Sequence, residues 1–307
     1  MRTMTWRSTN IGKATFFFVL CLAVTASCVR KTSRLPDSSS RQYEVVVAGD
    51  KNGTVTNALS VPVPGLPQNE PAFDVLSANK TSNVTNNVPD NVLNNVPDKY
   101  RYARSIVIFD RHTKLSAAHD RWASPQLIIR TDGTCPEALR RLINKFEAEC
   151  QLRQIEKKRN GKAEEYILKT FRHSIAVPAD LKAMKKGHDF LWLSNNTAES
   201  MKNIVVMKLM EGTDNIDGIN DILKHNIKGE TNCMYMRIAT VSDSTAGNCY
   251  GLWEIRNDIM GGPYSLRIFK DRTAVLAFVY APEKGKRNLM RQMQTILLSA
   301  DSKAVRR

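Results

Sequence analysis

Short β-branched and apolar segments follow one another along much of this chain, and few long helical patterns separate them. Such runs, bounded by Gly, Pro, Asn or Asp, are typical of strands. Because they arrive in neighbouring groups rather than in strict alternation with helices, they favour an α+β fold with a largely antiparallel sheet and packed helices. We expect about ten strands, at residues 43–48, 105–109, 126–130, 174–177, 190–194, 204–209, 234–241, 250–256, 264–270 and 273–280.

Helical spacing of apolar side chains predicts helices in both halves of the chain. The clearest begins after Thr134, which has capping-box spacing to Glu137 and is followed by Pro136 in the first turn. Others are expected at 162–171, 216–227 and 286–300, with a short helical piece near 117–122. The second half of the chain has the same pattern of short strands and interspersed helices as the first. Two structurally similar halves therefore remain an open alternative.

The first 27 residues have the pattern of an export signal. Three basic residues precede an apolar run at 14–26, and small residues then lead to Cys28. This run of 13 residues is shorter than the roughly 20 that a membrane-spanning helix needs. We interpret 1–27 as a lipoprotein signal peptide and Cys28 as the lipidation site, which would hold the mature protein on a membrane. A plain cleaved signal and a membrane anchor remain as alternatives.

Composition divides the remaining chain into a tether and two halves. Residues 28–42 are polar and contain Pro36 and three consecutive serines, so we expect a flexible tether. An N-terminal α+β half is expected at 43–172 and a C-terminal α+β half at 173–307. Asn-Asn-Val-Pro-Asp occurs at 86–90 and again at 94–98, which predicts a turn-rich loop.

Charge and cysteine content limit the partners. The formal net charge is +15, but the basic residues are scattered, and an export segment argues against nucleic acid. General attraction to anionic lipid headgroups or envelope polymers is the simpler account.

Helix geometry excludes a disulfide between Cys135 and Cys150. A bond between Cys233 and Cys249 across a hairpin, or free buried thiols, remain open.

No known catalytic pattern is present. The nucleophile elbow, the P-loop, the dinucleotide fingerprint, the His-Glu-x-x-His zinc motif and Cys-x-x-Cys are all absent from the sequence. The five histidines lack the spacing of metal ligands on a helix. We therefore name no catalytic residue, cofactor or metal ligand, and an enzyme is less expected than a binding protein.

One segment, 251–264, is the candidate binding site. A predicted strand ends at Asn257 and Asp258, and Gly261 and Gly262 are expected to reverse the chain with positive φ and to let a partner approach the backbone. The candidate binding residues are Trp253, Glu254, Arg256, Asn257, Asp258, Gly261, Gly262 and Tyr264. The alternative is a turn needed only for folding, with Trp253 as a core aromatic.

Several motifs together resemble an uncharacterised lipoprotein family of Bacteroidetes-type bacteria. They are Val63-Pro-Gly-Leu-Pro-Gln, Gly251-Leu-Trp253 with Asn257-Asp-x-Met-Gly-Gly-Pro263, and Tyr280-Ala-Pro282. The resemblance runs from about Tyr43 to Ser299. It implies a lipid-anchored envelope protein of a domain of unknown function and brings no activity, ligand or catalytic residue. Because basic and not acidic residues follow Cys28, the resemblance implies the periplasmic face.

These observations favour a lipid-anchored cell-envelope protein with a non-enzymatic binding or accessory role. Its expected partners are the membrane, through the N-terminal lipid, and another envelope protein or polymer. Two alternatives remain: a small-ligand-binding lipoprotein that uses a cleft between the halves, and a hydrolase of unfamiliar type.

Overall fold

The computed structural model describes residues 34–78, 96–212, 215–245 and 248–302. Cys28, the predicted signal peptide and most of the Asn-rich repeat lie outside these residues, so the predictions made for them stay predictions. From Asp37 onward the chain forms one compact unit. Within the described ranges, no helix is both long and apolar enough to cross a bilayer.

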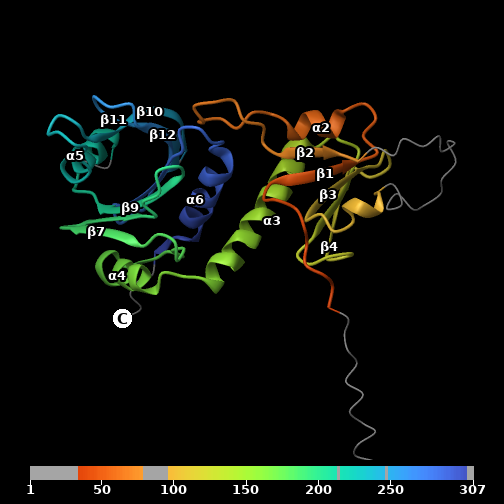
Figure 1. Ribbon diagram of the computed structural model, residues 1–307, viewed down its shortest axis with the longest axis horizontal. Coiled ribbons are helices and arrows are strands. Elements are labelled where there is room, and N and C mark those ends of the chain that lie inside the picture. The colour runs from red at the N-terminus through yellow and green to blue at the C-terminus, as the bar shows by residue number, and fades with distance from the viewer. Residues whose placement is uncertain (1–33, 79–95, 213–214, 246–247, 303–307) are drawn as a thin grey trace, which may run out of the picture. The chain divides into compact units, whose positions relative to one another are not determined.

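The first sheet has five strands in the order β2-β1-β3-β5-β4 and is mainly parallel (Figure 1). Its strands are β1 (Glu44–Ala48), β2 (Asp74–Ser77), β3 (Ser105–Phe109), β4 (Leu115–His119) and β5 (Leu127–Thr131). Four of the five residues of β1 are buried, because both faces of the sheet are covered. Helices α2 (Thr54–Leu59) and α3 (Pro136–Lys157) pack on one face, where Leu139 and Ile143 of α3 join the core.

The second sheet has seven antiparallel strands in the order β10-β11-β12-β13-β9-β8-β7. They are β7 (Ala183–Gly187), β8 (Phe190–Ser194), β9 (Met201–Lys208), β10 (Met236–Thr245), β11 (Asn248–Ile255), β12 (Gly261–Ile268) and β13 (Thr273–Tyr280). The associated helices are α4 (Gly161–Phe171), α5 (Ile216–Asn226) and α6 (Arg287–Ser299). The short strands β6 (His173–Ser174) and β14 (Asp301–Ser302) form a separate pair, and η2 (Asp98–Tyr100) is a 3₁₀ turn.

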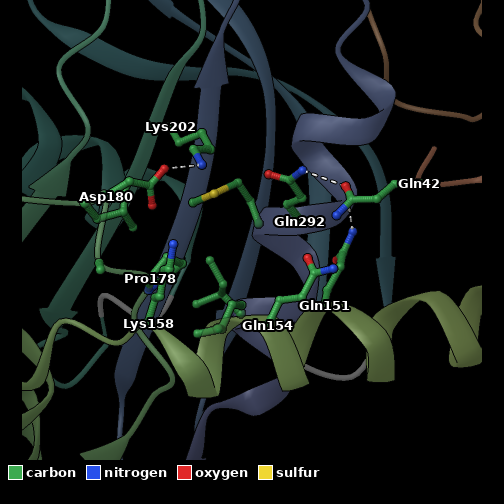
Figure 2. Close-up of a pocket in the computed structure, with 13 residues that line it drawn as sticks. Gln42, Gln151, Gln154, Lys158, Pro178, Asp180, Lys202 and Gln292 are labelled. Carbon is green, nitrogen blue, oxygen red and sulfur yellow. Dashed lines mark hydrogen bonds and ion pairs between the residues drawn. The ribbon is translucent and has the colours of Figure 1, made fainter. Parts of the chain in front are cut away.

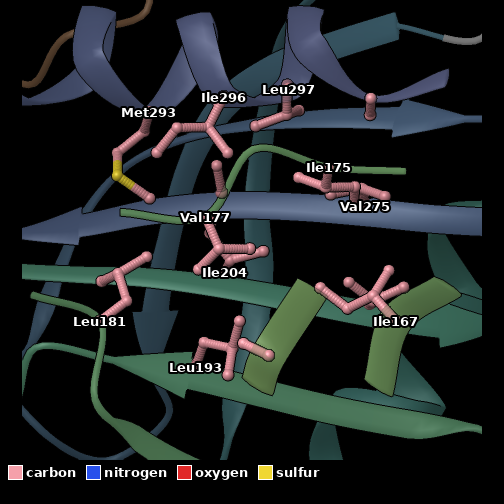
Figure 3. Packing of buried hydrophobic residues seen from close by; sticks show 14 of the residues in the cluster. Ile167, Ile175, Val177, Leu181, Leu193, Ile204, Val275, Met293, Ile296 and Leu297 are labelled. Carbon is pink, nitrogen blue, oxygen red and sulfur yellow. The ribbon is translucent and has the colours of Figure 1, made fainter. Parts of the chain in front are cut away.

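Each face of this second sheet has its own core. Leu193, Ile204 and Val275 project to the face covered by α4 and α6, where they meet Ile167 and Ile296 (Figure 3). The alternate residues, such as Val205 and Leu276, project to the opposite face, which α5 covers with Ile219 and Leu223. Strands buried on both faces explain why segments such as 273–280 read as continuous apolar runs.

The expected α+β class is confirmed, with a mostly antiparallel arrangement of strands, but several details differ. The strand expected at 174–177 is reduced to β6 at His173–Ser174, and β2 and β7 were not expected. Residues 115–119 form strand β4 and not a helix, because pairing with β5 overrides the helix preference of Ala117 and Ala118. The two halves are unlike, since one sheet is mainly parallel and the other antiparallel. The capping box is absent, because Thr134 bonds to Asp132 instead.

The four cysteines of the folded part are free thiols. Cys135 and Cys150 lie at the start and in the middle of α3, as the predicted helix required. Cys233 is exposed and bonds to Thr231, while Cys249 lies half-buried beside the Tyr264 hydroxyl.

Candidate functional site

A cavity of about 390 Å³ opens on the face of the second sheet that α5 covers. We call it the α5-face cavity. Its lining comes from both ends of the sheet, because the strands curve from β7 round to β11 (Figure 1). Its volume falls in the range of about 300–1,000 Å³ that is typical of small-molecule sites.

Aromatic rings and thioethers form the walls of this cavity. They are Trp192, Trp253, Phe278, Met201 and Met260. Thioethers are flexible and polarisable, so they adapt to ligands of different outline, while the rings offer rigid apolar surface. The cavity is therefore suited to an apolar body.

Trp253 is held firmly in the wall. Its Nε1 donates to the Val279 carbonyl at 3.1 Å, and its ring meets Phe278 edge-on with centroids 4.9 Å apart. This arrangement needs Gly262, because a Cβ there would collide with the Val279 oxygen and lie 3.3 Å from the Trp253 Nε1 atom. Gly262 therefore allows β12 and β13 to approach each other closely at this position.

Asn203 of β9 is fully buried behind the residues that line the cavity. It stands directly opposite Ser194 on one neighbouring strand and Phe278 on the other, and both line the cavity. Residues directly opposite one another share a face of the sheet, so the three side chains project to the same side. The Asn203 Oδ1 atom accepts a hydrogen bond from Trp192 Nε1 at 3.0 Å.

The rim of the cavity is polar and carries charges of both signs. Lys185 and Lys228 lie on it, and Lys185 donates to the Asn226 carbonyl at 2.6 Å. Asp258 completes the rim, where its Oδ1 atom accepts from the Ile259 amide at 2.6 Å. The side chain of Ile259 is 95% exposed beside it.

Of the eight candidate binding residues, Trp253 and Asp258 line this cavity. Tyr264 is buried in the same core, where burial raises the pKa of its hydroxyl above the usual range. Glu254 pairs with Arg237 at 2.6 Å on the sheet surface. Arg256 donates to the Tyr235 hydroxyl at 2.8 Å. These last two lie outside the cavity lining.

The chain reversal is built differently from the expectation. Gly261 and Gly262 already belong to β12, and neither has a positive φ. The residue in the left-handed region is Asn257, with φ 59°, whose side chain donates to the Cys233 carbonyl at 3.3 Å. The reversal thus precedes the glycines, and asparagine supplies the left-handed residue because it tolerates that region better than most side chains.

Sequence reasoning missed most of the cavity. Trp192 and Met201 come from strands that are far from 251–264 in the sequence, and Lys185 comes from a strand that was not predicted.

A second cavity, of about 260 Å³, lies between α3 and α6 (Figure 2). This position corresponds to the cleft between the two halves that the small-ligand alternative expected. Its amides bond to one another: Gln42 Oε1 accepts from Gln292 at 2.8 Å and from Gln151 at 3.4 Å. Lys202 is paired with Asp180 at 2.5 Å. These polar groups are already engaged, so the α5-face cavity is the stronger candidate.

Residues 160–299 match a domain of unknown function, DUF4837, and residues 38–165 match a second one, DUF8532. The chain is therefore similar to two uncharacterised domains over most of its folded part. The α5-face cavity lies within the DUF4837 match. No curated protein matches the chain.

Among the described residues, no three His, Cys, Asp or Glu side chains are grouped so that they could hold a metal ion.

Proposed function

We propose that this protein is a lipid-anchored, non-enzymatic binding protein of the bacterial cell envelope, and that the α5-face cavity holds its ligand. Cys28 carries the lipid and the polar tether spaces the fold from the membrane on the periplasmic side. The observation that carries the proposal is the cavity itself. It joins an apolar wall to a polar rim, which is the usual composition of a small-ligand site.

This cavity favours a small ligand over a protein or polymer partner. Its aromatic and thioether walls lie within a concave site, whereas protein partners bury about 800 Å² per side on a broader surface. A protein or polymer partner remains the second candidate, because Ile259 projects from the rim beside Asp258. If a variant whose cavity is filled still captured a protein or polymer, that result would favour this second candidate.

The test is a titration with a neutral apolar fluorophore, N-phenyl-1-naphthylamine, whose emission rises on transfer from water to an apolar site. Ala183 is exposed, lines the cavity and stands opposite Ser194, so Ala183→Trp fills the space from the edge strand. We expect the wild-type protein to bind the fluorophore and Ala183→Trp to lose at least tenfold in affinity.

Lys186→Trp is the matched control. Lys186 lies on the same strand, but its ammonium group sits over the Tyr166 ring of α4, on the other face of the sheet. This variant should bind as the wild type does. Equal binding by wild type and Ala183→Trp, or absence of binding by the wild type, would refute the assignment of the cavity.

The anchor is tested separately. Cys28→Ser should abolish metabolic labelling with a radioactive fatty acid and should release the protein from the membrane fraction. Membrane association that is unchanged in Cys28→Ser would contradict the lipid anchor and leave the cavity assignment standing.

A further inference from the structure

The last part of the predicted tether is fixed to one end of the first sheet. Asp37 forms a β-bridge with Ser124, shortly before β5 begins. The Ser39 amide donates to the Tyr102 carbonyl at 2.9 Å, shortly before β3 begins. Because β3 and β5 are parallel, both attachments lie at the same end of the sheet. The chain therefore joins the fold at the end of the first sheet where β3 and β5 start.

Covalent geometry limits how far this end can be from a lipid on Cys28. Asp37 comes nine positions after Cys28 in the sequence. A chain extends by at most about 3.3–3.6 Å per residue, so Asp37 lies within about 32 Å of Cys28. This distance is an upper limit, and a shorter path allows the fold to reach the membrane. A lipid on Cys28 therefore keeps this end of the sheet close to the bilayer.

Aromatic and basic side chains are gathered at the same end of the sheet. They come from η2 with the two residues that follow it and from the turn before β5, and they are Lys99, Tyr100, Arg101, Tyr102, Arg121 and Trp122. We call this set the tether-end surface. The guanidinium carbons of Arg101 and Arg121 lie 5.8 and 5.6 Å from the centre of the Trp122 ring. Tyr102 is 49% exposed, so the surface offers rings as well as charges.

The buried side chain of Gln126 holds the two segments of this surface together. Its Nε2 atom donates to the Arg101 carbonyl at 2.7 Å and to the Ala103 carbonyl at 2.8 Å. Its Oε1 atom accepts from the Trp122 amide at 3.0 Å. The rings and cations are therefore arranged in advance of any binding event.

Two cations of the tether-end surface are available to a partner. Arg101 is paired with Asp98 at 2.8 Å. Lys99 and Arg121 are exposed, and neither forms an ion pair with a carboxylate of the residues that the structure describes. Asp120, next to Arg121, accepts instead from the Gln126 amide at 2.8 Å. Unpaired surface cations near a membrane are attracted to anionic headgroups, and Trp and Tyr are enriched at the same level of the bilayer.

Resting on the proposed lipid anchor, we infer that the tether-end surface binds the anionic phospholipid headgroups of the membrane that holds Cys28. Lys99 and Arg121 bind the headgroup phosphates, while Tyr102 and Trp122 lie at the boundary between headgroups and acyl chains. A membrane fits this surface better than an anionic polymer does, because a polymer offers no apolar layer for the rings. The lipid fixes one point of the protein, and this second contact sets which end of the fold faces the bilayer.

Vesicle binding by the unlipidated chain tests this inference. Residues 29–307 contain the whole compact unit and differ from the proposed mature chain only by Cys28, so the lipid makes no contribution. We expect this chain to co-sediment with vesicles made of equal parts of phosphatidylglycerol and phosphatidylcholine, and to be released as the salt concentration rises. The double variant Lys99→Gln, Arg121→Gln should bind about thirtyfold more weakly, which corresponds to about 2 kcal/mol for two cations.

The double variant Arg111→Gln, Lys114→Gln is the matched control. Both residues are exposed and lie in the turn between β3 and β4, at the opposite end of the same sheet. The change in charge is the same, but these side chains are too far from the bilayer to contribute, so binding should stay within about twofold of the wild type. Equal weakening in the two double variants, or equally tight binding to phosphatidylcholine alone, would overturn the inference. Either result leaves the lipid anchor standing, because these chains lack Cys28.

A reporter on the surface tests the position of the rings. Tyr102→Trp places an indole there, and vesicles with brominated acyl chains quench an indole that lies at their surface. We expect more quenching in Tyr102→Trp than in the wild type. Val241→Trp is the control, because Val241 is 45% exposed but lies on β10 of the second sheet, and it should show no extra quenching. Absence of extra quenching in Tyr102→Trp would overturn the inference and favour an anionic polymer as the partner of the cations.

Discussion

Arg287 and Asp74 form a two-pronged ion pair, with distances of 2.6 Å from Nη2 to Oδ2 and 3.1 Å from Nη1 to Oδ1. The Arg287 side chain is 5% exposed. Beside it, the Glu70 carboxylate accepts from the amides of Lys286 and Arg287 at the N-terminus of α6. A carboxylate at this end of a helix stabilises it. The region that matches DUF8532 thus caps a helix of the region that matches DUF4837.

Asp74→Ala should lower the free energy of unfolding by about 2 kcal/mol, since it leaves a buried guanidinium without its charged partner. Chemical denaturation monitored by tryptophan fluorescence gives this value. Asp98→Ala is the control, because the Asp98 side chain is 86% exposed and its one ion pair among the described residues is with Arg101, three residues away. A change in Asp74→Ala no larger than in the control would contradict a stabilising role for the pair.

Gly262→Val should destabilise the protein by more than about 3 kcal/mol, because the new side chain would collide with the Val279 carbonyl and displace Trp253. Gly161→Val serves for comparison, since a Cβ at Gly161 meets no atom within 4 Å. Its free energy of unfolding should stay within about 0.5 kcal/mol of the wild type. Thermal unfolding followed by circular dichroism distinguishes the two, and similar losses would show that the close approach is unimportant.

Asp258→Ala should impair capture of the ligand while the protein melts at nearly the wild-type temperature. Asp258 is exposed on the cavity rim, and its only side-chain hydrogen bond among the described residues is with the next amide in the chain. We expect a stability change below about 0.5 kcal/mol. If Asp258→Ala melts much earlier, the carboxylate is a turn cap and its place in the binding site should be withdrawn.

The Asp271 carboxylate should make the protein sensitive to acid. Burial alone would raise its pKa, but hydrogen bonds from Lys208, Thr273 and His173 outweigh this and hold the pKa well below its usual range. Since the folded-state pKa is the lower one, the stabilisation is present above about pH 4 and is lost as the pH falls. The stability difference between wild type and Asp271→Asn should therefore shrink between about pH 5 and pH 2. A difference that stays constant in urea unfolding over this range would contradict the shift.

Strands with strong local signals were predictable from the sequence. Strands β8 and β13 have the predicted bounds, because both are buried runs rich in apolar side chains. Strand β7 escaped prediction because its sequence, Ala-Met-Lys-Lys-Gly, has the charges that protect a sheet edge. Its position is set by pairing with β8, which is a tertiary contact.

The candidate site was predictable only where it is local. Trp253 and Asp258 were found because one motif contains both. Trp192 and Met201 were not, because their place in one cavity depends on the pairing of β8 with β9, which a single motif does not reveal.

The most direct test of a small-ligand-binding protein is native mass spectrometry of the full, lipidated chain purified from cells in mild detergent. If the α5-face cavity holds a small ligand, a fraction of the molecules should carry one additional compound of low mass. That fraction should be absent from Ala183→Trp and retained in Lys186→Trp. A wild-type protein with no bound compound, or the same compound bound to Ala183→Trp, would contradict a ligand-binding role for the cavity.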